Sequence, residues 1–79
     1  MLRLTNFEKD RESIICDIYP EDSTAPGRLV FDITKGLLAS SFLPEGYEWC
    51  QNHVAHAERT LQELARDGVL PKERCVMWY

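Results

Sequence analysis

The sequence predicts a small α+β domain, in which a mostly antiparallel four- to five-stranded sheet carries one long helix on one face, in the order ββββαβ. Three observations predict this fold. Apolar and polar residues alternate in the first half of the chain, apolar residues then recur every three or four positions, and strand-forming residues return at the C-terminal end. A chain of 79 residues forms one domain, 1–79, and buries roughly 60% of its surface on folding.

The first half of the chain should supply four strands, at residues 2–8, 13–19, 28–34 and 37–43. Lys35 and Gly36 separate the last two strands. A two-residue connection that ends in glycine favours a tight hairpin, because glycine tolerates the positive φ of such turns. This hairpin would place Thr34 opposite Leu37. Six side chains would then share the core face of the sheet: Leu29, Phe31, Ile33, Leu38, Ser40 and Phe42.

A single helix is expected over residues 45–67. Pro44 suits the start of a helix, and Gly68 followed by Pro71 is typical of a helix end. The apolar stripe of this helix has spacings of three and four: Tyr47, Cys50, Val54, Ala57, Leu61, Leu64 and Ala65. The tail CVMWY at residues 75–79 should return to the sheet as the final strand.

Composition and charge argue against several classes of function. The net charge is -4 and the nine Lys and Arg residues are scattered, which argues against nucleic acid as a partner because phosphate contacts dominate that affinity. No apolar run is long enough to span a membrane, and no signal peptide is visible, so we expect a cytoplasmic protein without membrane contact. The three separated cysteines do not form a disulfide framework, and each is expected to be a small buried apolar residue.

The stretch EWCQNHVAHAE contains Cys50, His53 and His56 in the pattern C-x-x-H-x-x-H. On a helix, these three side chains fan out over about 120°, so they do not converge on one ion. A zinc site that uses His53 and His56 would need a third ligand from elsewhere, such as Cys75 or an acidic residue. A second reading pairs the Cys50 thiol with His53 as its base, but the chain has no glycine-rich loop near either residue. We therefore predict no catalytic residues, no metal and no cofactor, with the zinc site kept as an alternative.

Trp49, His53, His56 and Thr60 lie on a second helical stripe beside the apolar one. An exposed stripe with an aromatic residue is typical of a contact surface. The alternative is that Trp49 packs under the C-terminal strand or under the loop 20–27. We predict a non-enzymatic interaction or regulatory module that binds a protein partner or forms a homodimer, through this stripe or through the less apolar face of the sheet. Nucleic-acid binding through the sheet face, with Tyr19, Trp78 and Tyr79 as stacking groups, is a further alternative.

The last third of the chain carries the run LPEGYEWC at residues 43–50, His53 and His56, LPKE at residues 70–73, and MWY at residues 77–79. In this pattern the chain resembles a group of small uncharacterised bacterial proteins. The resemblance covers about half of the chain. It implies a bacterial cytosolic setting and a helix and tail that act as one unit, and it transfers no activity and no catalytic residue.

Overall fold

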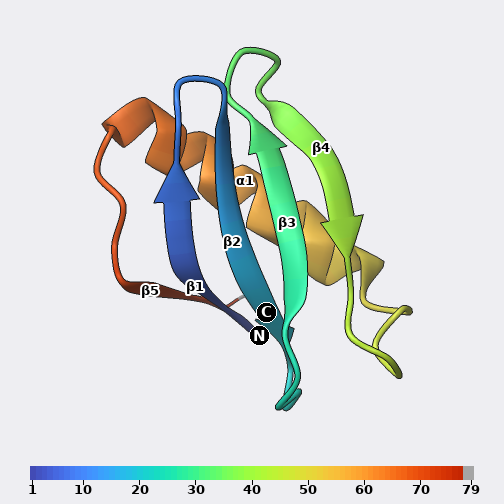
Figure 1. Ribbon diagram of the computed structural model, residues 1–79. Helices are drawn as coiled ribbons and strands as arrows, with labels where there is room; N and C mark the ends of the chain where they lie inside the picture. The colour runs from blue at the N-terminus through green and yellow to red at the C-terminus, as the bar shows by residue number, and fades with distance from the viewer. Residues whose placement is uncertain (78–79) are drawn as a thin grey trace.

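The computed structural model describes residues 1–77 and contains one five-stranded sheet and one helix (Figure 1). The elements follow the chain as β1 (Leu2–Lys9), β2 (Ser13–Pro20), β3 (Gly27–Asp32), β4 (Leu37–Phe42), α1 (Gln51–Asp67) and β5 (Glu73–Val76). The order of strands in the sheet is β4-β3-β2-β1-β5, and every neighbouring pair is antiparallel. The predicted α+β class and the order ββββαβ are confirmed.

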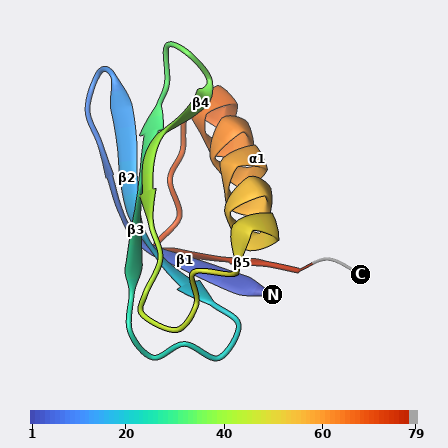
Figure 2. The same cartoon turned by 90° about the vertical axis from the view of Figure 1, so that its right-hand side faces the viewer.

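The helix covers one face of the sheet, so that the molecule has two layers (Figure 2). Strand alternation puts one apolar set under the helix, as in β2, where Ile14, Cys16 and Ile18 are buried and the residues between them are half-exposed. The remaining core residues come from β1, β3 and α1: Leu2, Leu4, Leu29, Phe31, Ala57, Leu61 and Leu64. No element within residues 1–77 covers the other face of the sheet.

The connection between β3 and β4 is longer than predicted. Asp32, not Thr34, lies opposite Leu37, and residues 33–36 form the turn. Asp32 holds this turn with two acceptors: its carbonyl oxygen accepts from the Gly36 N–H at 2.9 Å, and its Oδ1 accepts from the Lys35 N–H at 2.9 Å. The side-chain acceptor stabilises a four-residue turn in place of the two-residue hairpin.

The register of β4 also differs from the prediction, because the pairing shifts between Val30 and Phe31. After this bulge Ser41 lies opposite Leu29, and Phe42 lies opposite Arg28. One extra residue in a strand reverses the faces of all residues beyond it. The prediction that Ser40 and Phe42 face the core is therefore wrong, and the Phe42 side chain is 67% exposed.

Helix α1 begins at Gln51, six residues later than predicted. The segment before it forms two successive turns, closed by bonds from the Tyr47 N–H to the Pro44 carbonyl and from the Cys50 N–H to the Tyr47 carbonyl, both at 3.0 Å. Gly46 has a φ of 89°, which no residue inside a right-handed helix adopts. The predicted end is confirmed: Gly68 is left-handed, with a φ of 79°, and its N–H donates to the Leu64 carbonyl.

The C-terminal segment returns to the sheet, as predicted, and β5 pairs with β1. Its strand is the four residues Glu73–Val76, and the predicted positions Trp78 and Tyr79 lie outside the described residues. Cys16 and Cys50 are buried as predicted, whereas Cys75 is exposed. Cys75 lies on the edge strand β5 opposite Arg3, on the side of the sheet that the helix does not cover. Within residues 1–77, no helix is long and apolar enough to cross a membrane.

Candidate functional site

The segment Leu43–Cys50 joins the edge strand β4 to the start of α1, and it carries two aromatic side chains at the surface. Tyr47 and Trp49 stack with 6.4 Å between their ring centroids and 28° between their planes. The Tyr47 hydroxyl donates to Asp22 Oδ1 at 2.7 Å, which joins this segment to the loop after β2. That loop and the segment Leu43–Cys50 lie at the same end of the molecule (Figure 2).

Trp49 is exposed and yet fixed in position. Its side chain is 66% exposed. Its indole Nε1–H donates to the Gly46 carbonyl at 3.0 Å, and its ring meets the His53 ring edge-on, with centroids 5.8 Å apart and planes at 88°. Hydrogen bond, stacking partner and edge contact together hold one orientation of the indole.

A polar cluster lies beneath Trp49 and ties three parts of the chain together. The Glu21 carboxylate accepts a hydrogen bond from His53 Nε2 at 2.6 Å and another from the Met1 amine at 3.3 Å. These bonds, with the one from His53 the larger cause, hold the pKa of Glu21 below its ordinary value. Glu21 has a φ of 51°, so its backbone is strained in the left-handed region. The strain is held by contacts to the first residue of the chain and to the first turns of α1.

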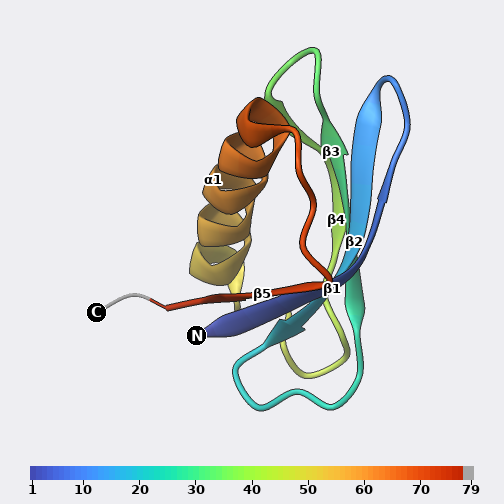
Figure 3. The same ribbon diagram turned by 90° about the vertical axis from the view of Figure 1, so that its left-hand side faces the viewer.

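The four residues predicted to form one exposed stripe differ in burial. Trp49 is exposed, which excludes the alternative that it packs under the loop 20–27 or the C-terminal strand, and His56 is half-buried. His53 and Thr60 are each 6% exposed, so the expectation that they line the surface is wrong. His53 Nε2 is bonded to Glu21 in the loop after β2, and Thr60 lines a hollow together with Arg74, Cys75 and Val76 of β5. The start of β1 and the strand β5 lie below the first turns of α1 (Figure 3).

The metal and thiol readings of the C-x-x-H-x-x-H pattern gain no support. Among residues 1–77, no three His, Cys, Asp or Glu side chains lie close enough together to hold a metal ion. Cys50 is buried, and burial, followed by the charge of Glu21, raises the pKa of its thiol. An activated cysteine needs a lowered pKa, so this environment is the opposite of what a nucleophile requires.

The uncovered sheet face carries Tyr19, one of the three residues predicted to stack on bases. The Arg3 guanidinium lies over the Tyr19 ring, 4.6 Å from its centroid, and so occupies one face of that ring. Arg28 on the same sheet face lies 4.0 Å from the Asp17 carboxylate. The nucleic-acid alternative stays a prediction, and its other two stacking residues, Trp78 and Tyr79, lie outside the described residues.

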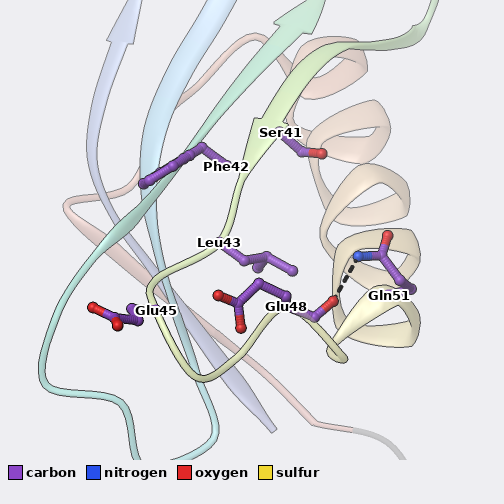
Figure 4. Close-up of a pocket in the computed structure, with 6 residues that line it drawn as sticks. All are labelled: Ser41, Phe42, Leu43, Glu45, Glu48 and Gln51. Carbon is purple, nitrogen blue, oxygen red and sulfur yellow. Dashed lines mark hydrogen bonds between the residues drawn. The ribbon is translucent and has the colours of Figure 1, made fainter.

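The structure adds a surface groove that the sequence did not indicate. It has a volume of about 290 Å³ and runs between the end of β4 and the start of α1. Figure 4 shows Phe42 pointing away from the helix, Ser41 pointing toward it, and the Glu48 carboxylate below Leu43. The groove is lined by Ser41, Phe42, Leu43, Glu45, Glu48 and Gln51. Sequence reasoning missed it because the alternation of β4 placed Phe42 in the core, and only the bulge turns Phe42 outward.

Comparisons with known proteins add no information about this site. No protein-family model matches the chain, and neither curated proteins nor solved structures give a significant match. The resemblance to small bacterial proteins stays a prediction.

Proposed function

We propose that the chain is a non-enzymatic protein-interaction module of the bacterial cytoplasm, which binds a partner protein or a second copy of itself through the segment Leu43–Cys50. The observation that carries the proposal is the position of Trp49, which is 66% exposed and yet held by a hydrogen bond to Gly46 and by ring contacts with Tyr47 and His53.

The physical argument concerns the cost of ordering a side chain on binding. A mobile side chain loses rotamer freedom when a partner immobilises it, which costs about 0.5–1.5 kcal/mol. The hydrogen bond to Gly46 and the ring contacts with Tyr47 and His53 restrict this freedom of Trp49 in the free chain. Its exposed apolar area is then available to a partner without that cost, and tryptophan is among the residues most enriched at the energetic centres of interfaces.

The surroundings of Trp49 support the same proposal. The bond from the Tyr47 hydroxyl to Asp22 and the bond from His53 to Glu21 anchor the segment to the loop after β2. Contacts of this kind keep the surface from rearranging, so the free and bound forms of the segment should be alike.

The test compares Trp49→Ala with Val69→Ala. Val69 is 74% exposed and follows the far end of α1, so its substitution removes exposed apolar area away from the proposed surface. Sedimentation velocity over a concentration series first measures self-association of the purified chain. If the chain stays monomeric, the same two variants are compared against a partner purified from a bacterial lysate with the wild-type chain.

We expect Trp49→Ala to weaken the dimer or the partner complex by about 30-fold, which corresponds to the roughly 2 kcal/mol typical of a central interface residue. Val69→Ala should change the affinity by less than about twofold, as expected of a surface substitution outside the interface. Equal affinities for the wild-type chain and Trp49→Ala would refute the proposal.

A further inference from the structure

The groove beside β4 combines an exposed aromatic side chain with unbalanced negative charge. Phe42 is 67% exposed at its rim, and Leu43 supplies further apolar surface. Glu45 and Glu48 also line the groove, and no Lys or Arg of the described residues is among those that line it. An occupant that fits this lining has an apolar group for Phe42 and a cation for the two carboxylates.

The groove also opens onto an unpaired strand edge. In the sheet formed by residues 1–77, strand β4 has a neighbour on one side only, so the outer backbone groups at its groove end can accept another extended chain. The far end of β4 is different, because Glu58 Oε2 of α1 accepts from the Leu38 N–H at 2.8 Å. The bulge beyond Val30 further separates the two halves of the strand. An added strand is therefore confined to the stretch from Ser40 to Phe42.

The opposite edge of the sheet lacks these properties. Strand β5 has four residues and carries Glu73 and Arg74, each in an ion pair, with Arg3 and with Glu63 respectively. Short charged edge strands resist pairing with another chain. β4, in contrast, reads LLASSF and has no charged residue.

We propose that the groove of Phe42, Leu43, Glu45 and Glu48 binds an extended segment of a partner protein in which basic residues alternate with apolar residues. The segment lies along the outer edge of β4 at Ser40–Phe42, with one apolar side chain against Phe42 and one Lys or Arg between the two carboxylates. This inference rests on the proposed function, since it assigns the partner class of the same segment, Leu43–Cys50.

The experiment uses two peptides as probes of this chemistry. A hexapeptide that alternates Arg and Val is titrated into the ¹⁵N-labelled chain, and a charge-reversed hexapeptide that alternates Glu and Val is titrated in parallel. Backbone amide shifts are followed by NMR at low salt and again at about 0.5 M salt, where exposed charges are screened. We expect saturable shifts at residues 40–51 with the Arg peptide only, and a weaker affinity at the higher salt concentration.

Three variants test the assignment to side chains. Phe42→Ala removes the aromatic rim, and the double variant Glu45→Gln with Glu48→Gln removes the charge. The amide that replaces the Glu48 carboxylate retains an oxygen for the bond that Glu48 now accepts from the Gly46 N–H. The Phe42 variant and the double charge variant should each weaken binding of the Arg peptide by about tenfold, a change of the size expected for one central contact. Leu37→Ala is the control, because Leu37 is 53% exposed at the other end of β4, and it should leave the affinity unchanged.

Three results would overturn the inference: equal shifts with both peptides, shifts centred outside residues 40–51, or no saturable shift up to about 5 mM peptide. A dissociation constant above about 5 mM is near the weak limit of specific binding. The charge variant changes only exposed side chains, so it remains informative even if Phe42→Ala fails to fold. The inference and the proposed function can fail separately. A complex that is weakened by Trp49→Ala but unaffected by the double charge variant would overturn the groove assignment and leave the proposed function standing.

Discussion

The substitution Gly27→Ala tests how β3 positions the groove. Gly27 begins β3 and is buried. A Cβ atom at this position would lie far inside van der Waals contact with the Phe42 carbonyl oxygen, 2.9 Å from Ile18 Cγ2 and 3.0 Å from Leu43 Cα. Two of these three neighbours are backbone atoms of the chain that forms the groove, so they cannot move aside as a flexible side chain can.

The expected destabilisation follows from two opposing effects. Overpacking of a buried site costs about 1–3 kcal/mol, and a clash with backbone places this site at the upper end. The loss of glycine flexibility in the unfolded chain offsets about 0.4–1 kcal/mol. The net expectation is a loss of about 2 kcal/mol in the free energy of unfolding, which lowers the urea midpoint by about 2 M at a slope near 1 kcal/mol/M.

Gly36→Ala is the matched control. No atom of the described residues lies within 4 Å of a Cβ added at Gly36, and the expected cost comes from its φ of 70°, about 1 kcal/mol for a non-glycine residue. Urea denaturation followed by circular dichroism should therefore rank Gly27→Ala below Gly36→Ala in stability. A Gly27→Ala variant within about 0.5 kcal/mol of the wild-type chain would refute the close approach of β3 to the groove, since that range is typical of neutral surface changes.

Three further predictions concern the cluster and the core. Glu21 is held below its ordinary pKa of 4.5 in the folded chain, so it stabilises the fold above that value and loses this contribution as the pH falls through its lowered pKa. Urea denaturation at about pH 6 and about pH 3 should therefore show a smaller loss of stability for Glu21→Gln than for the wild-type chain, and an equal loss would count against the cluster. A thiol-exchange reagent should modify Cys75 rapidly in the folded chain, because Cys75 is exposed, and should modify Cys16 and Cys50 slowly, because both are buried. Burial also raises the pKa of Cys16 to about 12. Equal modification rates for the three thiols would contradict this difference in burial. Phe31→Ala should lower the free energy of unfolding by about 3–5 kcal/mol in the same urea assay, and a loss under about 1 kcal/mol would place Phe31 outside the core.

The sequence allowed the fold class to be predicted because its signals are local. Alternation in β2 places Ile14, Cys16 and Ile18 on one face whatever the neighbouring strands do. The end of α1 was equally accessible, since Gly68 is the residue type that tolerates the left-handed conformation at a helix end. Both features depend on a few adjacent residues.

The predictions were wrong where the backbone conformation depends on contacts that are distant in the sequence. Pro44 and Glu45 suit a helix start, but Gly46 adopts a positive φ and the chain makes two turns before α1 begins. The bulge in β4, which exposes Phe42, is set by pairing with β3 and leaves no mark in the alternation of β4 itself.

The candidate site was predicted only in part, because some of its contacts are local in the sequence and others are not. The helical spacing grouped Trp49 with His53, and the structure brings their rings into contact. The hydrogen-bond partner of His53 is Glu21, which is 32 positions away in the sequence and lies in the loop after β2. No pattern within the helix could indicate this partner.

The most direct test of the account is the mobility of the Trp49 indole, because the proposed function requires an exposed ring that is already ordered. Nuclear spin relaxation of the indole Nε1–H gives its order parameter, and a Trp78→Phe variant assigns the signal to Trp49. A bond held to the Gly46 carbonyl should give an order parameter near roughly 0.85, as in a rigid backbone. A value below about 0.6, typical of flexible groups, would contradict the claim that the chain presents a preorganised contact surface.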